Sequence, residues 1–101
     1  MDLKEELLNV INKIDFSKHK CDLEFKSING SGEIKDINIY VEGIWITFEK
    51  EYDWYIHRER LSLLSVKKFM FYFDINDGNL KRIRLEFYFD EITYTILLSE
   101  R

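Results

Sequence analysis

Residues 69–75, 81–89 and 92–98 each alternate apolar with polar side chains, which is the period of a β-strand that buries one face. Aligned antiparallel through the two turns between them, the segments bring apolar residues of all three into register. The aligned triplets are Phe73, Ile83 and Leu98; Phe71, Leu85 and Ile96; and Phe69, Phe87 and Tyr94. Because a slip of one residue would turn every side chain to the other face, the pattern predicts a three-stranded antiparallel sheet.

The beginning of the chain has the period of a helix instead. Residues 2–15 place apolar side chains along one stripe, and these are Leu3, Leu7, Val10, Ile11 and Ile14. Asp2 can cap the helix, and Glu5 follows three residues later, where the acid of a capping box is found. We therefore predict a helix over 2–15 that packs its apolar stripe on the sheet.

After the helix the period becomes two, and turn residues separate the segments. The glycine-rich turn at 29–32 predicts a hairpin, because glycine accepts the positive φ that short loops need. With a three-residue loop, Leu23 lies opposite Ile39, and Phe25 lies opposite Ile37.

Two structures fit the next break. Glu42 and Gly43 form either a two-residue hairpin loop or, with Gly43 as a bulge, part of one long strand. The hairpin is favoured because it sets Ile39 opposite Ile46, apolar against apolar.

The third part of the chain holds one more turn and one ambiguous stretch. A turn at 50–52 predicts a hairpin with Trp54 opposite Phe48. The stretch 58–68 fits either a strand or a short helix, since periodicity cannot decide over so short a run.

Together these segments predict an α+β fold of a single domain over 1–101: an N-terminal helix followed by a six- to seven-stranded, strongly curled antiparallel β meander over 22–98. One helix about 10 Å across cannot cover the whole apolar face. Either the sheet curls into a barrel or half-barrel, closed or open, which we favour, or a second subunit covers the remainder. The uncharged, proline-free segment 92–98 then either closes the barrel against an earlier strand or forms the edge of a homodimer.

Composition sets the class of protein. At 101 residues, 46% apolar and 16% aromatic, the chain can form one folded domain. No run approaches the roughly 18 apolar residues of a membrane span, and Asp2, Glu5 and Glu6 predict that the N-terminus is not a secretory signal. The single cysteine, Cys21, excludes an internal disulfide, so we expect a buried thiol in a cytoplasmic protein.

Charge and motifs narrow the function. The net charge of −4 argues against nucleic acid as the main partner, because proteins that bind nucleic acid usually carry a basic excess. The sequence has no P-loop, no dinucleotide-binding glycine fingerprint and no nucleophile elbow. His19 and His57 have no cysteine or second histidine at ligand spacing, so we expect no metal and no cofactor. The chain is predicted not to be an enzyme.

Candidate binding residues lie on the polar side of the three C-terminal strands. The alignment makes Tyr72, Arg84 and Leu97 lateral neighbours and puts Tyr88 beside Lys68. The predicted partner-binding residues are Met70, Tyr72, Arg82, Arg84, Glu86 and Tyr88. Tyrosine, methionine and arginine are enriched at the centres of protein interfaces. Aromatic and basic residues on an open sheet also stack on the bases of single-stranded RNA. In the third interpretation, these side chains only pair with their neighbours on adjacent strands and bind no partner.

A second candidate is an acidic patch at one turn. Glu49, Glu51 and Asp53 lie close together in the sequence. They either offer a negative surface to a basic partner or form a solvated loop.

These observations predict a small acidic, non-enzymatic interaction protein. We expect an inhibitor or immunity-type protein that neutralises another protein, such as a basic toxin or a nucleic-acid-processing enzyme. The alternative is an RNA-binding or small-ligand-binding β-barrel that uses the tyrosines and arginines of the polar side or the region of His57, Arg58 and Arg60.

Overall fold

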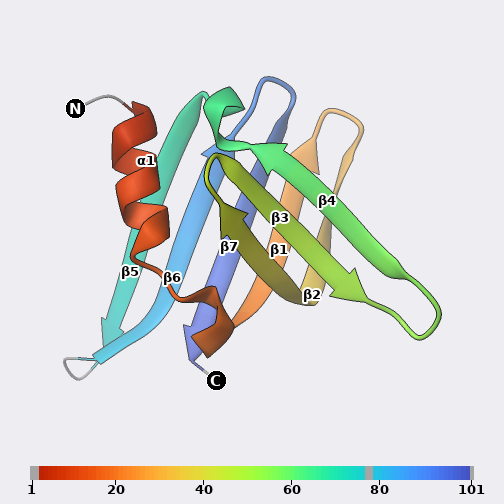
Figure 1. Ribbon diagram of the computed structural model, residues 1–101, viewed down its shortest axis with the longest axis horizontal. Helices are drawn as coiled ribbons and strands as arrows, with labels where there is room; N and C mark the ends of the chain where they lie inside the picture. Colours follow the sequence, from red (N-terminus) through yellow and green to blue (C-terminus); the bar gives the residue numbers. More distant parts are fainter. Residues whose placement is uncertain (1–2, 77–78, 101) are drawn as a thin grey trace.

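The computed structural model describes residues 3–76 and 79–100, which form one α-helix, two 3-10 turns and seven strands (Figure 1). In chain order the elements are α1 (Leu3–Asn12), η1 (Phe16–Lys18), β1 (His19–Ser27), β2 (Gly30–Glu42), β3 (Trp45–Glu51), β4 (Ile56–Ser62), η2 (Leu63–Ser65), β5 (Lys68–Asn76), β6 (Asn79–Tyr88) and β7 (Ile92–Glu100). All strand pairs are antiparallel, so the predicted helix followed by an antiparallel sheet is confirmed.

The strands form one sheet in the order β4-β3-β2-β1-β7-β6-β5. Two meanders, β1 to β4 and β5 to β7, are joined because β1 pairs with β7 from His19 opposite Glu100 to Ser27 opposite Ile92. The last strand thus pairs with an earlier strand, as in one of the two alternatives, but this pairing does not close a barrel. Its other side pairs with β6, so β7 has no free backbone edge and the prediction of a homodimer edge there is wrong.

The sheet remains open between β4 and β5. No strand pairing joins these two strands among the described residues. The connection between them contains η2, whose Leu63 is buried and whose cap, Ser62, accepts a hydrogen bond from the backbone N–H of Leu64 at 3.2 Å. The barrel is therefore not closed, and the stretch 58–68 is both strand and helical turn in succession.

β2 bends the sheet in its middle, because its first half pairs with β1 and its second half with β3. The register with β1 shifts at this point, and Asp36 has a φ of 55°. The backbone N–H of Asp36 donates to Asp22 Oδ1 at 3.0 Å, and Lys50 Nζ donates to the backbone oxygens of Lys35 and Asp36 at 2.7 and 3.3 Å. Beyond this bulge, β3 and β4 cross over the β1–β7 part of the sheet (Figure 1).

The hairpin of β1 and β2 has a different register from the one expected. Leu23 lies opposite Ile34, and Phe25 lies opposite Gly32; neither meets its expected partner in 37–39. A Cβ on Gly32 would come within 2.5 Å of the Phe25 ring, so the glycine leaves room for this ring against the backbone.

The hairpin around Gly43 is confirmed, but its loop begins at Gly43 rather than at Glu42. Gly43 has a φ of 58°, which a two-residue loop needs and which glycine adopts without strain. As a result Ile39 lies opposite Phe48 rather than Ile46.

The β3–β4 hairpin differs most from the prediction. Its turn is longer, and the backbone N–H of Tyr52 closes it by donating to the carbonyl oxygen of Tyr55 at 2.8 Å. Glu59 takes the place opposite Phe48 that was predicted for Trp54. Because this register is displaced by an odd number of residues, the two faces of β4 are exchanged, and Trp54 lies at the turn with 89% of its surface exposed.

The three C-terminal strands have the predicted register. Phe71 pairs with Leu85, which pairs with Ile96, and the other two triplets align as expected. Leu85 and Ile96 are completely buried in a core that also receives Leu7 and Ile11 of α1. The helix lies at the β5 end of the sheet (Figure 1) and is shorter than predicted, ending at Asn12.

Tyr94 on β7 connects the crossing strands to the main part of the sheet. Its ring lies 5.7 Å from the ring of Phe48 on β3, and its hydroxyl donates to Glu59 Oε1 on β4 at 2.5 Å. Burial, together with the hydrogen bond and the charge of Glu59, raises the pKa of Tyr94 above its ordinary value.

Replacing Tyr94 by phenylalanine should lower the free energy of unfolding by about 2 kcal/mol at neutral pH, because the hydrogen bond to a charged group is lost. The loss should shrink at alkaline pH. Above about pH 10 the tyrosine of the unfolded chain ionises while the folded one stays neutral, so its contribution is present below pH 10 and is lost as the pH rises. Urea denaturation at several pH values measures this.

At about pH 11 the difference between wild type and Tyr94→Phe should be smaller by about 1.4 kcal/mol than at pH 7. Tyr40→Phe, which removes a hydroxyl from an exposed side chain, is the control. A constant difference between pH 7 and 11 would contradict the role of the Tyr94 hydroxyl.

Candidate polar binding face

The candidate site is the polar face, which we define as the side chains of β5, β6, β7, β1 and the first half of β2 that point away from the core. The strand register aligns them in rows across the sheet. The rows are Arg82, Ser99 and Lys20; Tyr72, Arg84, Leu97 and Asp22; Met70, Glu86, Thr95, Glu24 and Glu33; and Lys68, Tyr88, Thr93, Lys26 and Ser31. The six predicted partner-binding residues therefore lie on one face, and the predicted lateral neighbours are confirmed.

Four of these six side chains form one connected chain with Lys68. The Arg84 guanidinium lies 4.5 Å from the centre of the Tyr72 ring, and its Nη2 donates to Glu86 Oε1 at 2.8 Å. The other oxygen of Glu86 accepts a short hydrogen bond from the Tyr88 hydroxyl. Lys68 Nζ lies 5.4 Å from the centre of the Tyr88 ring. The side chains are thus held in place before any partner binds.

This network changes the titration of its members. The hydrogen bond to Glu86, followed by desolvation and the charge of Glu86, raises the pKa of Tyr88. Desolvation alone would lower the pKa of Arg84, but the hydrogen bond to Glu86 and its charge outweigh this and raise the pKa. Both raised pKa values keep Arg84 charged and Tyr88 neutral at neutral pH.

Two grooves open on the polar face. One has a volume of about 520 Å³, and its lining includes Asp22, Lys35, Tyr72, Arg82, Arg84 and Leu97. The other has a volume of about 940 Å³ beside the β6–β7 turn. Its lining contains one cation, Lys26, and five carboxylates, which belong to Glu24, Glu33, Glu86, Asp90 and Glu91. We call this second groove the acidic groove.

Two carboxylates of the acidic groove lie directly opposite each other on neighbouring strands. Glu24 of β1 pairs with Glu33 of β2, and both are exposed. Like charges in this position cost a few tenths of a kcal/mol, as an order of magnitude. Lys35 Nζ lies 3.6 Å from Glu33 Oε1 and offsets part of that cost at the surface. The arrangement favours a ligand that brings positive charge.

The predicted acidic patch at the β3–β4 hairpin is divided. Glu49 is mostly covered and holds Arg58 in a two-point contact, with Arg58 Nε and Nη2 each 2.9 Å from its Oε2. Glu51 and Asp53 are exposed at and beside the turn. Of the three predicted carboxylates, only Glu51 and Asp53 therefore contribute exposed negative charge.

The sequence interpretation missed an exposed aromatic cluster at this turn. We call it the aromatic tip, and its members are Tyr52, Trp54, Tyr55 and Ile56. Turns usually carry glycine, asparagine, aspartate, proline or serine, so three aromatic residues within four positions were the available signal. Because Trp54 was predicted to lie opposite Phe48 in the core, its exposure at the turn was not expected.

Of the other reactive side chains, His57 is exposed on β4, while His19 and Cys21 are engaged or buried. His19 Nδ1 donates to the backbone oxygen of Asp15 at 2.9 Å, and Cys21 is buried as predicted. Within the described residues, no group of three or more histidine, cysteine, aspartate or glutamate side chains is arranged to hold a metal ion. In the same part of the chain, no helix has the length and apolar character to cross a membrane.

Comparison of the chain with protein-family models, curated proteins and solved structures finds no match. Function is therefore inferred from the polar face and the aromatic tip themselves.

The substitution Glu86→Gln should return the pKa of Tyr88 toward the ordinary value of 10.0, because the charged acceptor that favours the neutral phenol is removed. An NMR titration of ring-labelled tyrosine measures this. Glu24→Gln lies in the same row without a contact to the Tyr88 hydroxyl and serves as the control. If both variants leave the titration unchanged, the network does not exist in solution.

Proposed function

We propose that this chain is a small, non-enzymatic cytoplasmic protein that binds and neutralises another protein through its polar face. The partner is basic, as a toxin or a nucleic-acid-processing enzyme can be, and the chain acts as its inhibitor or immunity-type protein. The observation that carries the proposal is the acidic groove beside the ordered chain of Tyr72, Arg84, Glu86 and Tyr88.

The ordered side chains favour tight association. Tyrosine and arginine supply a large share of the energy at protein interfaces. Immobilising a free side chain costs about 0.5–1.5 kcal/mol on binding. Because Arg84 is already held between Tyr72 and Glu86, part of that cost falls on folding instead.

The size of the polar face suits one protein partner. Five neighbouring strands, β5 to β2 through β6, β7 and β1, are about 20 Å across at the usual strand spacing. A surface of this width matches one side of a standard protein interface, about 800 Å².

The carboxylate row on the face favours a basic protein over nucleic acid. The row that contains Glu86, Glu24 and Glu33 runs across the strands between two rows that carry cations. A lysine or arginine of a partner would relieve the repulsion of Glu24 and Glu33. A phosphate backbone crossing the same row would be repelled.

Binding of RNA or of a small ligand is the alternative. Tyr72 and Tyr88 could stack on bases. However, Arg84 already forms an ion pair with Glu86. The row of Glu86, Glu24 and Glu33 also separates the cations of the two rows on either side of it. We therefore make RNA binding an outcome of the experiment.

The double variant Tyr72→Ala/Arg84→Ala should weaken partner binding at least about tenfold, because two interface anchors are removed. Tagged wild-type protein is first used to recover its partner from native lysate treated with nuclease, at low and moderate salt. The recovered protein is then produced separately, and its Kd is measured by calorimetry for each variant.

Tyr40→Ala/Lys13→Ala removes the same kinds of side chain from exposed positions outside the polar face and is the matched control. One dominant protein that survives nuclease and loses affinity only with the polar-face variant supports the proposal. Recovery of nucleic acid that disappears at moderate salt would instead support the RNA-binding alternative.

A further inference from the structure

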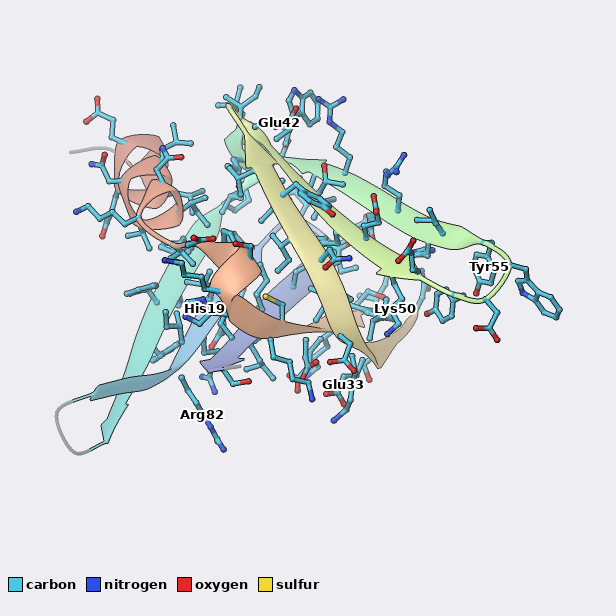
Figure 2. All side chains as sticks on the ribbon, turned by 60° about the horizontal axis from the view of Figure 1, so that its bottom comes forward. His19, Glu33, Glu42, Lys50, Tyr55 and Arg82 are labelled. Atoms are coloured by element: carbon cyan, nitrogen blue, oxygen red, sulfur yellow. The ribbon has the colours of Figure 1, made fainter. Side chains whose placement is uncertain are left out.

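The aromatic tip projects from the molecule at the end of the β3–β4 hairpin. Figure 2 shows Tyr55 at this end, on a different side from Arg82 and Glu33 of the polar face. Trp54 is 89% exposed, more than any other large apolar side chain among the described residues. Nothing in the described part of the chain covers it.

The tip is rigid at its base. The rings of Tyr52 and Tyr55 stack with their centres 4.7 Å apart and 13° between their planes. The backbone hydrogen bond between the same two residues closes the turn. Lys50 ties the hairpin to the β2 bulge through the carbonyl oxygens of Lys35 and Asp36. Trp54 is therefore presented on an ordered turn, which lowers the entropic cost of inserting it into a partner.

The charge around Trp54 is negative. Glu51 and Asp53 are exposed on either side of Tyr52. Two cations lie nearby. Lys50 Nζ binds backbone oxygens of β2 and lies 6.0 Å from the centre of the Tyr52 ring, and Arg58 binds Glu49. An aromatic anchor flanked by two carboxylates complements an apolar pocket whose rim carries lysine or arginine.

We propose that the aromatic tip is a second contact with the basic protein partner, in which Trp54 inserts into an apolar pocket and Glu51 and Asp53 bind cations at its rim. This inference rests on the proposed function, since it concerns the same partner, but it uses a surface separate from the polar face. Tryptophan is one of the residue types enriched among the residues that dominate the binding energy of interfaces.

The same negative charge disfavours other occupants. A single-stranded nucleic acid could stack on the tip but would bring phosphates beside Glu51 and Asp53. An anionic membrane surface would be repelled in the same way, although tryptophan and tyrosine suit a lipid interface. Both occupants are included in the test.

The partner recovered with wild-type bait is the probe, and its Kd is measured with tip variants. Trp54→Ala should weaken binding at least about 30-fold, the loss expected for a dominant interface residue. Glu51→Gln/Asp53→Asn should weaken binding less and flatten its dependence on salt. Tyr40→Ala, also an exposed aromatic position, is the control and should stay within twofold of wild type. Because Trp54 is mostly exposed, its replacement should leave the fold intact, and circular dichroism verifies this.

Other results overturn the inference. If Trp54→Ala binds within twofold of wild type while Tyr72→Ala/Arg84→Ala fails to bind, the proposed function stands and the tip is not a contact. If both variants bind normally, or wild-type bait retains no protein, both proposals are wrong. Binding of oligothymidylate, of phosphatidylcholine vesicles with or without phosphatidylserine, or of a second copy of this chain that depends on Trp54 would assign the tip to that occupant instead.

Discussion

The pairing of β1 with β7 is the interaction on which the rest of this structure depends. Each meander alone would leave a long backbone edge exposed, and their union satisfies the hydrogen bonds of both strands along the full length of β1. The union also creates the polar face, because the rows of Glu86 with Glu24 and of Arg84 with Asp22 run across the junction. Neither groove on this face would exist in a separate meander.

The bulge of β2 at Asp36 allows the sheet to cover part of its own apolar face. A seven-stranded flat sheet would need more cover than one short helix can supply. The left-handed Asp36 redirects the strand, and the crossing strands then cover the inner face with Ile46 and Phe48. Tyr94 and Glu59 hold the two parts together. The sheet therefore supplies much of its own second layer and leaves its outer face open.

The exposed surfaces separate into two kinds. On the polar face, charged and aromatic side chains pair with each other before binding, so the face combines order with unbalanced carboxylates in one groove. At the aromatic tip, stacked tyrosines support an unpaired tryptophan. Ordered polar groups and a projecting aromatic anchor are complementary parts of a protein interface, the first giving specificity and the second affinity. Together they support the proposal of a binder with two contact regions on one small domain.

The sequence by itself determined the helix and the register of β5, β6 and β7. There the alternation is regular and the turns are short, so only one alignment brings the three apolar triplets into register, and it placed Tyr72 beside Arg84 correctly. The tertiary structure decided the registers of the first meander, where a bulge at Asp36 and a longer turn after Glu51 displace the pattern. It also decided that β1 pairs with β7 and that Trp54 is exposed. These outcomes depend on contacts between residues far apart in the chain, and a period of two is satisfied equally well by several partners for each strand.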